Sequence, residues 1–202
     1  MFELAILILI RHGQSVWNAE NRFTGWTDVD LSDKGVREAE EAGNELMNQT
    51  IDVVHTSDLI RAKRTAEIVM QANVSSKGTV TKSDWRLNER NYGALQGLNK
   101  AETADKHGAE QVRIWRRSFD VAPPEGESLE MTAERTIPYF EEEILPDLES
   151  GVNVLVSAHG NSLRSIVMHI EGISPEDIVS FEIQTGVPRY YKYSDGEISL
   201  VG

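Results

Sequence analysis

Two short apolar segments decide most of what this chain can fold into. Residues 4–10 and 152–157 are almost continuously hydrophobic, and each leads into a His-Gly pair, at His12 and His159. Runs of this length without polar alternation are typical of strands buried on both faces of a parallel sheet. Amphipathic helical patterns lie between and after them, over about 33–48, 59–70, 128–149 and 161–171. This alternation predicts a three-layer α/β/α sandwich with a mainly parallel central sheet.

Weaker patterns fill in the rest of the chain. We expect further strands at 51–55 and 78–82, short helices near 99–107 and 109–118, and a hairpin over 189–201. Ser32 is placed to cap the first long helix. Pro138 and Pro146 should kink or end the helix that begins near Ser128. With 202 residues, 40% of them hydrophobic, and no repeat or clear linker, we expect one domain over residues 1–202.

Charge and cysteine content exclude several functions. The formal net charge of −13 argues against nucleic acid and anionic membranes as partners, but not against a small anionic substrate. Because there is no cysteine, neither a thiolate nucleophile nor a cysteine-ligated metal site can exist. The apolar start has no basic segment and carries Glu3, so we expect no signal peptide and a cytoplasmic protein. The sequence leaves monomer and homo-oligomer equally open.

The two His-Gly pairs mark the expected site. Ligands of open α/β sheets bind at the carboxyl ends of strands, so His12 and His159 could share one crevice. Basic residues recur in the other candidate loops, at Arg61, Arg90, Lys100, Arg116, Arg117 and Arg164. One arginine guanidinium can bind two oxygens of the same phosphate. The positive charge of an arginine also lowers the pKa of a nearby histidine, which keeps the imidazole neutral and nucleophilic. This combination indicates phosphoryl transfer through a histidine.

Other chemistries compete with this interpretation. His12, His159 and Glu89 could bind zinc, although no HExxH pattern is present. An aspartate nucleophile within residues 28–32 would need a buried strand before it, and residues 23–27 resemble a loop instead, so we interpret 30–32 as a turn and helix cap. No glycine-rich loop ends in Gly-Lys-Ser or Gly-Lys-Thr, which disfavours an ATPase.

The motif RHGQS at 11–15, with Trp17 and Asn18, resembles the signature of the histidine phosphatase superfamily. A closer resemblance, over nearly the whole chain, is to the 2,3-bisphosphoglycerate-dependent phosphoglycerate mutases. It is carried by FTGW at 23–26, LIRA at 59–62 with Thr65 and Ala66, WRLNERNYGALQGLNKAET at 85–103, WRRSF at 115–119, PP at 123–124, AHGNSLR at 158–164 and TGVP at 185–188. Longer members carry an extra segment where only Glu125 and Gly126 stand here.

The resemblance implies a phosphoglycerate mutase-like fold and the interconversion of 3-phosphoglycerate and 2-phosphoglycerate, a step of glycolysis and gluconeogenesis. His12 would carry the phosphoryl group, Arg11, Arg61 and His159 would surround it, and Glu89 would act as general acid and base, its pKa raised by bound phosphates. The implied substrate-binding residues are Ser15, Asn18, Thr24, Gly25, Tyr92, Lys100, Arg116, Arg117, Gly160 and Asn161. The implied cofactor is 2,3-bisphosphoglycerate, which would phosphorylate His12, and no metal is implied.

Two alternatives share this fold. A histidine phosphatase acting on small phosphoesters would use His12, Arg11, Arg61 and His159 but would not need Arg116 and Arg117. A catalytically silent binding module is disfavoured because every expected reactive residue is present.

Overall fold

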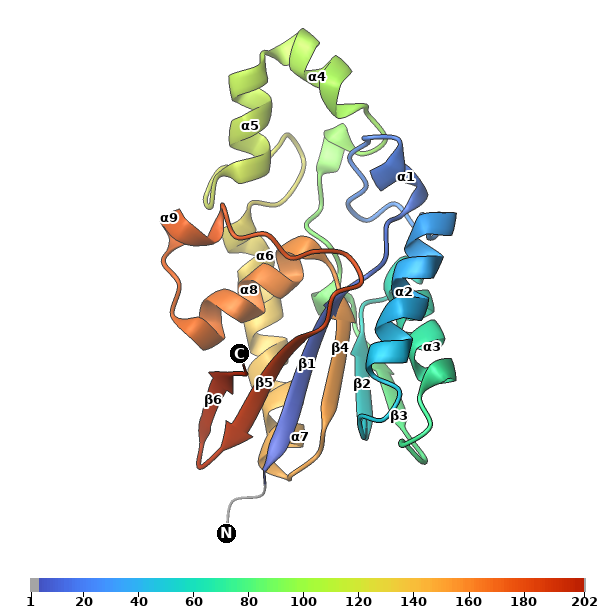
Figure 1. The fold of residues 1–202 in the computed structure, drawn as a ribbon. Helices are drawn as coiled ribbons and strands as arrows, with labels where there is room; N and C mark the ends of the chain where they lie inside the picture. Colours follow the sequence, from blue (N-terminus) through green and yellow to red (C-terminus); the bar gives the residue numbers. More distant parts are fainter. Residues whose placement is uncertain (1–3, 202) are drawn as a thin grey trace.

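The computed structural model describes residues 4–201, and six strands of this range form one sheet (Figure 1). The strands are β1 Ala5–Arg11, β2 Val53–Thr56, β3 Val80–Ser83, β4 Val154–Ala158, β5 Arg189–Ser194 and β6 Glu197–Leu200, in the order β3-β2-β4-β1-β5-β6. The first four of that order are mutually parallel, whereas β5 runs antiparallel to β1, and β6 to β5. The predicted, mainly parallel sheet is confirmed, with an antiparallel hairpin at one edge.

Helices cover both faces of this sheet, as predicted. On one face lie α2 Asp33–Glu45 and α3 Ile60–Ala72; on the other lie α6 Leu129–Tyr139, α7 Leu145–Glu149 and α8 Gly160–Glu171 (Figure 1). Successive side chains of a strand point to opposite faces of the sheet. Ile8 and Ile10 therefore pack in the core under α2 and α3. Leu7 and Leu9 pack in the core on the opposite face, under α6, α7 and α8. The apolar run over β1 is therefore buried on both sides.

The long helical pattern after Ser128 is continuous but not uniform. Ser128 caps α6 by accepting a hydrogen bond from the amide of Met131. Pro138 lies inside α6, and a π-helical turn, Phe140–Ile144, comes directly after it. A proline lacks an amide donor and crowds the turn that precedes it, and this π-helical turn lies directly before Pro146, in the first turn of α7. The widened turn is therefore accounted for by Pro146, whereas Pro138 is accommodated inside α6.

A helical pair lies beyond the carboxyl ends of the parallel strands. It consists of α4 Lys100–His107 and α5 Ala109–Arg117, which stand apart from the sheet layers in Figure 1. Val112 of α5 packs against Phe23 and Leu95 in a small apolar cluster separate from the two cores beside the sheet. This separate cluster lets α4 and α5 overhang the end of the sheet.

Short elements complete the fold. Two single-turn 3₁₀ helices, Trp85–Leu87 and Gly93–Leu95, form part of the mixed region before α4. The sequence did not predict α1 Val16–Ala19 or α9 Pro175–Ile178, because four residues are too few to show a helical period. No helix within residues 4–201 is long and apolar enough to cross a membrane.

Candidate active site

Three parallel strands bring their carboxyl ends to one edge of the sheet. His12 follows β1, His159 follows β4, and Ser57 follows β2. The backbone amide of His12 donates to Ala158 O at 3.0 Å, which joins the first two strand ends. Both imidazoles are buried, and their ring centroids lie 4.9 Å apart. The two histidines singled out in the sequence thus lie side by side at this edge of the sheet.

The surroundings of His12 select its tautomer. Its Nδ1 lies 2.6 Å from Gly13 O, and because a carbonyl only accepts, Nδ1 carries the hydrogen and the free lone pair is on Nε2. Gly13 itself is sterically required, since an added Cβ would lie 2.1 Å from Gly35 O. Burial, and the charges of Arg61 and Arg11, lower the pKa of His12 well below its usual 6.5. At neutral pH His12 is therefore uncharged, and its Nε2 lone pair is free to act as a base or a nucleophile.

His159 is held as a neutral hydrogen-bond donor. Its Nε2 lies 2.7 Å from Ser57 Oγ, which also accepts the amide of Leu59 at 3.2 Å. The Ser57 hydroxyl hydrogen is then available to Nε2, and this pattern favours the hydrogen of His159 on Nδ1. That Nδ1 is buried and has no hydrogen-bond partner within residues 4–201. Burial, followed by the charge of Arg61, lowers the pKa of His159 as well.

Two guanidinium groups flank His12. Arg61, in the first turn of α3, is almost fully buried and donates to Gly25 O at 2.7 Å and Thr27 O at 3.0 Å. Burial lowers the pKa of Arg61 to about 10, so it stays cationic at neutral pH. Arg11 donates from Nη1 to Ile183 O at 2.9 Å, while its buried Nε has no partner in the described part of the chain. Both groups are held by backbone carbonyls, and neither is within ion-pair distance of a carboxylate among the described residues, although Glu89 acts on both through space.

One oxygen of the Glu89 carboxyl group is fully engaged. Oε1 accepts the Arg90 amide at 2.8 Å and two donors of Asn161, its amide at 3.1 Å and Nδ2 at 2.9 Å. Oε2 faces Gly160, where an added Cβ would lie 3.8 Å away. Burial favours the protonated acid, but the Asn161 hydrogen bond and the Arg11 charge leave the pKa of Glu89 below its usual range. From the sequence we expected a raised pKa beside bound phosphate; the protein's own groups act in the opposite direction.

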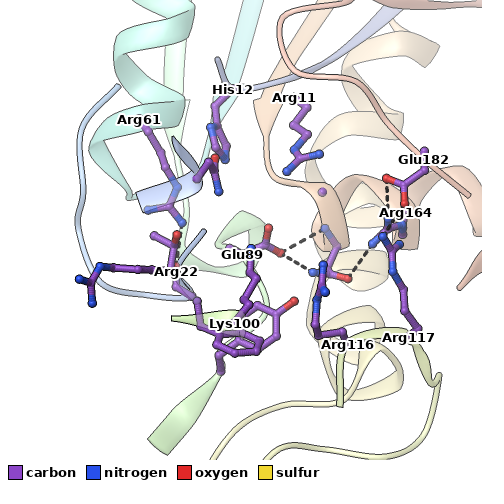
Figure 2. A pocket seen from close by; sticks show the side chains of 17 residues that line it. Arg11, His12, Arg22, Arg61, Glu89, Lys100, Arg116, Arg117, Arg164 and Glu182 are labelled. Atoms are coloured by element: carbon purple, nitrogen blue, oxygen red, sulfur yellow. Dashed lines mark hydrogen bonds and ion pairs between the residues drawn. The ribbon is translucent and has the colours of Figure 1, made fainter. Parts of the chain in front are cut away.

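Most of the residues predicted from the sequence line one pocket, and Figure 2 shows their side chains converging around Glu89. The predicted residues among its lining are Arg11, His12, Asn18, Thr24, Gly25, Arg61, Glu89, Tyr92, Lys100, Arg116, Arg117, Gly160 and Asn161. His159 lies against His12, outside the lining. Ser15 also lies outside it and forms a capping box with Asn18, which orients α1.

Comparison with known proteins adds the family. The family model described as "Histidine phosphatase superfamily (branch 1)" matches residues 7–202. A 2,3-bisphosphoglycerate-dependent phosphoglycerate mutase of Protochlamydia amoebophila is 49% identical over 95% of this chain and 96% of its own length. A 2,3-bisphosphoglycerate-dependent phosphoglycerate mutase of Cytophaga hutchinsonii is 51% identical over 95% of this chain and 89% of its own length. The chain belongs to the family of 2,3-bisphosphoglycerate-dependent phosphoglycerate mutases. The family resemblance seen in the sequence is confirmed.

Solved structures agree on the fold of this mutase family member. A phosphoglycerate mutase from Bacillus anthracis has a TM-score of 0.83 at 23% identity, covering 99% of this chain and 92% of its own. A mycobacterial glucosyl-3-phosphoglycerate phosphatase also has a TM-score of 0.83, at 24% identity, covering 98% and 97%. Mutase and phosphatase share the architecture, so the fold alone does not separate the two activities.

Four further residues line the pocket: Arg22, Phe23, Arg164 and Glu182. The sequence marks Arg164 only as a basic residue, and Phe23 only as part of a motif. Arg22 directly precedes that motif, and its Nη1 donates to Gly97 O at 2.7 Å. No sequence pattern predicts Glu182 as a pocket residue, because an acidic side chain is not expected among the basic residues of this pocket. Arg90, another predicted basic residue, is buried behind the pocket and donates to Tyr92 and to Arg116 O.

The zinc alternative gains no support from the geometry. Within residues 4–201, no group of three or more histidine, aspartate or glutamate side chains is placed to hold a metal ion. Residues 28–30 lie in a loop and do not follow a strand, Leu31 forms a single bridge with Ser15 rather than a turn, and Ser32 caps α2 as predicted by accepting from the Gly35 amide.

The buried neutral histidines predict how stability depends on pH. In the unfolded chain a histidine titrates near 6.5, whereas the folded-state pKa values of His12 and His159 lie well below that value. As the pH falls through 6.5 the unfolded state gains protons first, so the free energy of unfolding should decrease by up to about 1.4 kcal/mol per pH unit for each group. Urea unfolding at several pH values below and above 6.5 measures this decrease. His12→Asn should show a smaller decrease than the parent, and an identical decrease would contradict the assignment.

Proposed function

We propose that this chain interconverts 3-phosphoglycerate and 2-phosphoglycerate through a phosphorylated His12, and that 2,3-bisphosphoglycerate primes it. The observation that carries the proposal is one pocket with a neutral histidine nucleophile at one end and Lys100, Arg116 and Arg117 at the other. A substrate with a phosphate and a second anionic group matches both ends. Relatives about 50% identical that are known as 2,3-bisphosphoglycerate-dependent phosphoglycerate mutases support this activity.

The polar groups of the pocket fit a polyanionic ligand. Its lining contains seven arginine and lysine side chains but only two carboxylates. Buried polar atoms without partners within residues 4–201 include Arg11 Nε, Thr24 Oγ1 and His159 Nδ1, all at or beside the pocket. Buried donors are rarely left unpaired without a functional reason. The bisphosphorylated cofactor would be held by these groups, and the chemistry it supplies is a phosphoryl group for His12.

The residues divide the chemistry between them. His12 Nε2 gives up its phosphoryl group as the N–P bond breaks and an O–P bond forms to the free substrate hydroxyl. Glu89 Oε2 accepts the hydroxyl proton in the same step and returns it to the leaving oxygen when His12 takes a phosphoryl group from the other position. His159 Nδ1, Arg11 and Arg61 stabilise the charge on the transferring group. His12 thus ends the cycle phosphorylated, and Glu89 ends it in its starting protonation state.

The low pKa of Glu89 in the protein alone also fits this cycle. An ionised carboxylate is ready to accept the substrate's proton. Once it has done so, the dianionic phosphoryl groups beside it oppose its ionisation, because like charges favour the neutral acid. Glu89 can then keep the proton until the second transfer requires it.

Arg116 and Arg117, at the end of the pocket away from His12, distinguish a mutase from a general histidine phosphatase. Arg116→Ala with Arg117→Ala should lower kcat/KM for 3-phosphoglycerate by about 10³, because two charged contacts to the second anionic group are lost. Hydrolysis of p-nitrophenyl phosphate, which has no such group, should change by less than about threefold. A coupled assay of 2-phosphoglycerate formation and an absorbance assay of nitrophenol measure the two.

Arg113→Ala is the matched control for that pair. Arg113 lies on the same helix α5 but is exposed and forms its ion pair with Glu110, outside the pocket. It should retain both activities. Full mutase activity in the Arg116/Arg117 double variant would favour the phosphatase alternative over the mutase.

A further inference from the structure

Glu182 is an acidic side chain in the wall of a pocket made for anions. It lies in the segment between α9 and β5, and its carboxylate stands between two arginines of different helices (Figure 2). Oε1 lies 2.6 Å from Nη2 of Arg117 on α5, and Oε2 lies 3.4 Å from Nη2 of Arg164 on α8. The carboxylate therefore bridges the overhanging helical pair and the body of the fold.

The two arginines are held very differently. The Arg164 side chain is 10% exposed, donates from Nε to Phe181 O at 2.6 Å, and contacts Asn161 Oδ1 through Nη1 at 3.2 Å. It stays in place without Glu182. Arg117 is 33% exposed, and its other hydrogen bond is a long one, 3.5 Å, to Val179 O. Glu182 is thus the main partner that fixes Arg117.

The ion pair between Glu182 and Arg117 is easily exchanged. The Glu182 side chain is 58% exposed, so solvent screens its attraction to Arg117. Exposed pairs of this kind contribute little to stability, on the order of 0–1 kcal/mol. A phosphate dianion carries more charge than a carboxylate and offers three oxygens to a guanidinium, so it can replace Glu182 on Arg117.

We propose that Glu182 competes with the ligand for Arg117 and Arg164, and thereby lowers the affinity of the pocket for bisphosphorylated ligands. The proposal rests on the proposed mutase function. It deepens that function by naming a residue that sets how tightly the pocket holds the ligand's second anionic group, the one farther from His12. In a mutase the bisphosphorylated intermediate must exchange its two ends at His12, so both ends must be able to dissociate. Binding that is too tight would slow this exchange without helping the chemical step.

Glu182→Gln tests the competition directly. The variant is made in a His12→Ala background, which has no nucleophile to phosphorylate, and titrated calorimetrically with 2,3-bisphosphoglycerate. Removing the competing charge should tighten binding about five- to tenfold, because an opposing carboxylate near a polyanion is lost. Inorganic phosphate needs only the end of the pocket near position 12, so its affinity should differ by less than about twofold between the variants with and without Glu182→Gln. In the His12-containing enzyme, Glu182→Gln should lower the mutase kcat while leaving the single-turnover labelling of His12 unchanged.

Matched variants separate competition for Arg117 from a purely structural effect of Glu182. Glu182→Asp keeps the charge and should bind the bisphosphate nearly as the parent does. Glu149→Gln, at an exposed position of α7, makes the same charge change outside the pocket and should have no effect. Unchanged or weaker bisphosphate binding in Glu182→Gln would overturn the proposal, because Glu182 would then only orient Arg117. If the parent binds phosphate but not the bisphosphate, the proposed mutase function fails instead.

Discussion

Replacing His12 by asparagine is expected to lower mutase turnover by about 10⁴-fold or more, because no other group can form the covalent intermediate. Asparagine keeps an amide donor toward Gly13 O, so the loop at the end of β1 should retain its shape. His159 does not substitute, since its Nε2 is engaged by Ser57 and its remaining hydrogen is on the nitrogen that would have to attack. A steady-state assay of 2-phosphoglycerate formation measures the loss.

His169→Asn provides the control for the same chemical change. His169 lies near the far end of α8, is partly exposed, and pairs with Glu141. Its replacement should leave turnover within about twofold of the parent, as expected for a surface substitution away from the site. More than a tenth of the parent's turnover in His12→Asn would show that transfer does not pass through His12.

Glu89→Gln should lower turnover of phosphoglycerates by about 10³-fold, because general acid–base catalysis contributes on the order of 10²–10⁴. Glutamine keeps one oxygen for the Arg90 and Asn161 donors but cannot take or return a proton. The effect should depend on the leaving group. Phosphoryl transfer from p-nitrophenyl phosphate, whose leaving oxygen needs no proton, should fall by less than about tenfold.

Glu134→Gln tests whether the leaving-group dependence is specific to Glu89. Glu134 is an exposed residue of α6, outside the pocket, and its replacement should affect neither substrate. If Glu89→Gln slowed both substrates equally, Glu89 would be a structural anchor for Asn161 rather than an acid and base.

The sequence predicted the sheet, its two helical layers and most of the pocket, for identifiable reasons. Buried parallel strands are continuous apolar runs, and the residues at their carboxyl ends meet at one sheet edge, so the convergence of His12 and His159 could be deduced. The hairpin was equally predictable, because Asp195 and Gly196 both adopt positive φ in the turn between β5 and β6. These features depend on local patterns that one chain displays.

Other features depend on contacts between distant segments. Nothing near Ser57 in the sequence shows that its hydroxyl meets His159, 102 positions later. Glu182 is one acidic residue among many, and only the approach of α5 and α8 gives it two arginine partners. The π-helical turn before Pro146 was also unpredicted, because a kink and a widened turn have the same sequence signal. The direction of the pKa shift at Glu89 likewise depends on donors that the fold assembles.

The most direct test of transfer through His12 is to incubate the protein with radioactive 2,3-bisphosphoglycerate and to follow the label. Phosphohistidine is stable in base and labile in acid, unlike phosphoserine. We predict a base-stable, acid-labile label on His12 of the parent, no label in His12→Asn, and loss of the label on addition of 3-phosphoglycerate. A label that survives acid, or one that persists in His12→Asn, would contradict this mechanism.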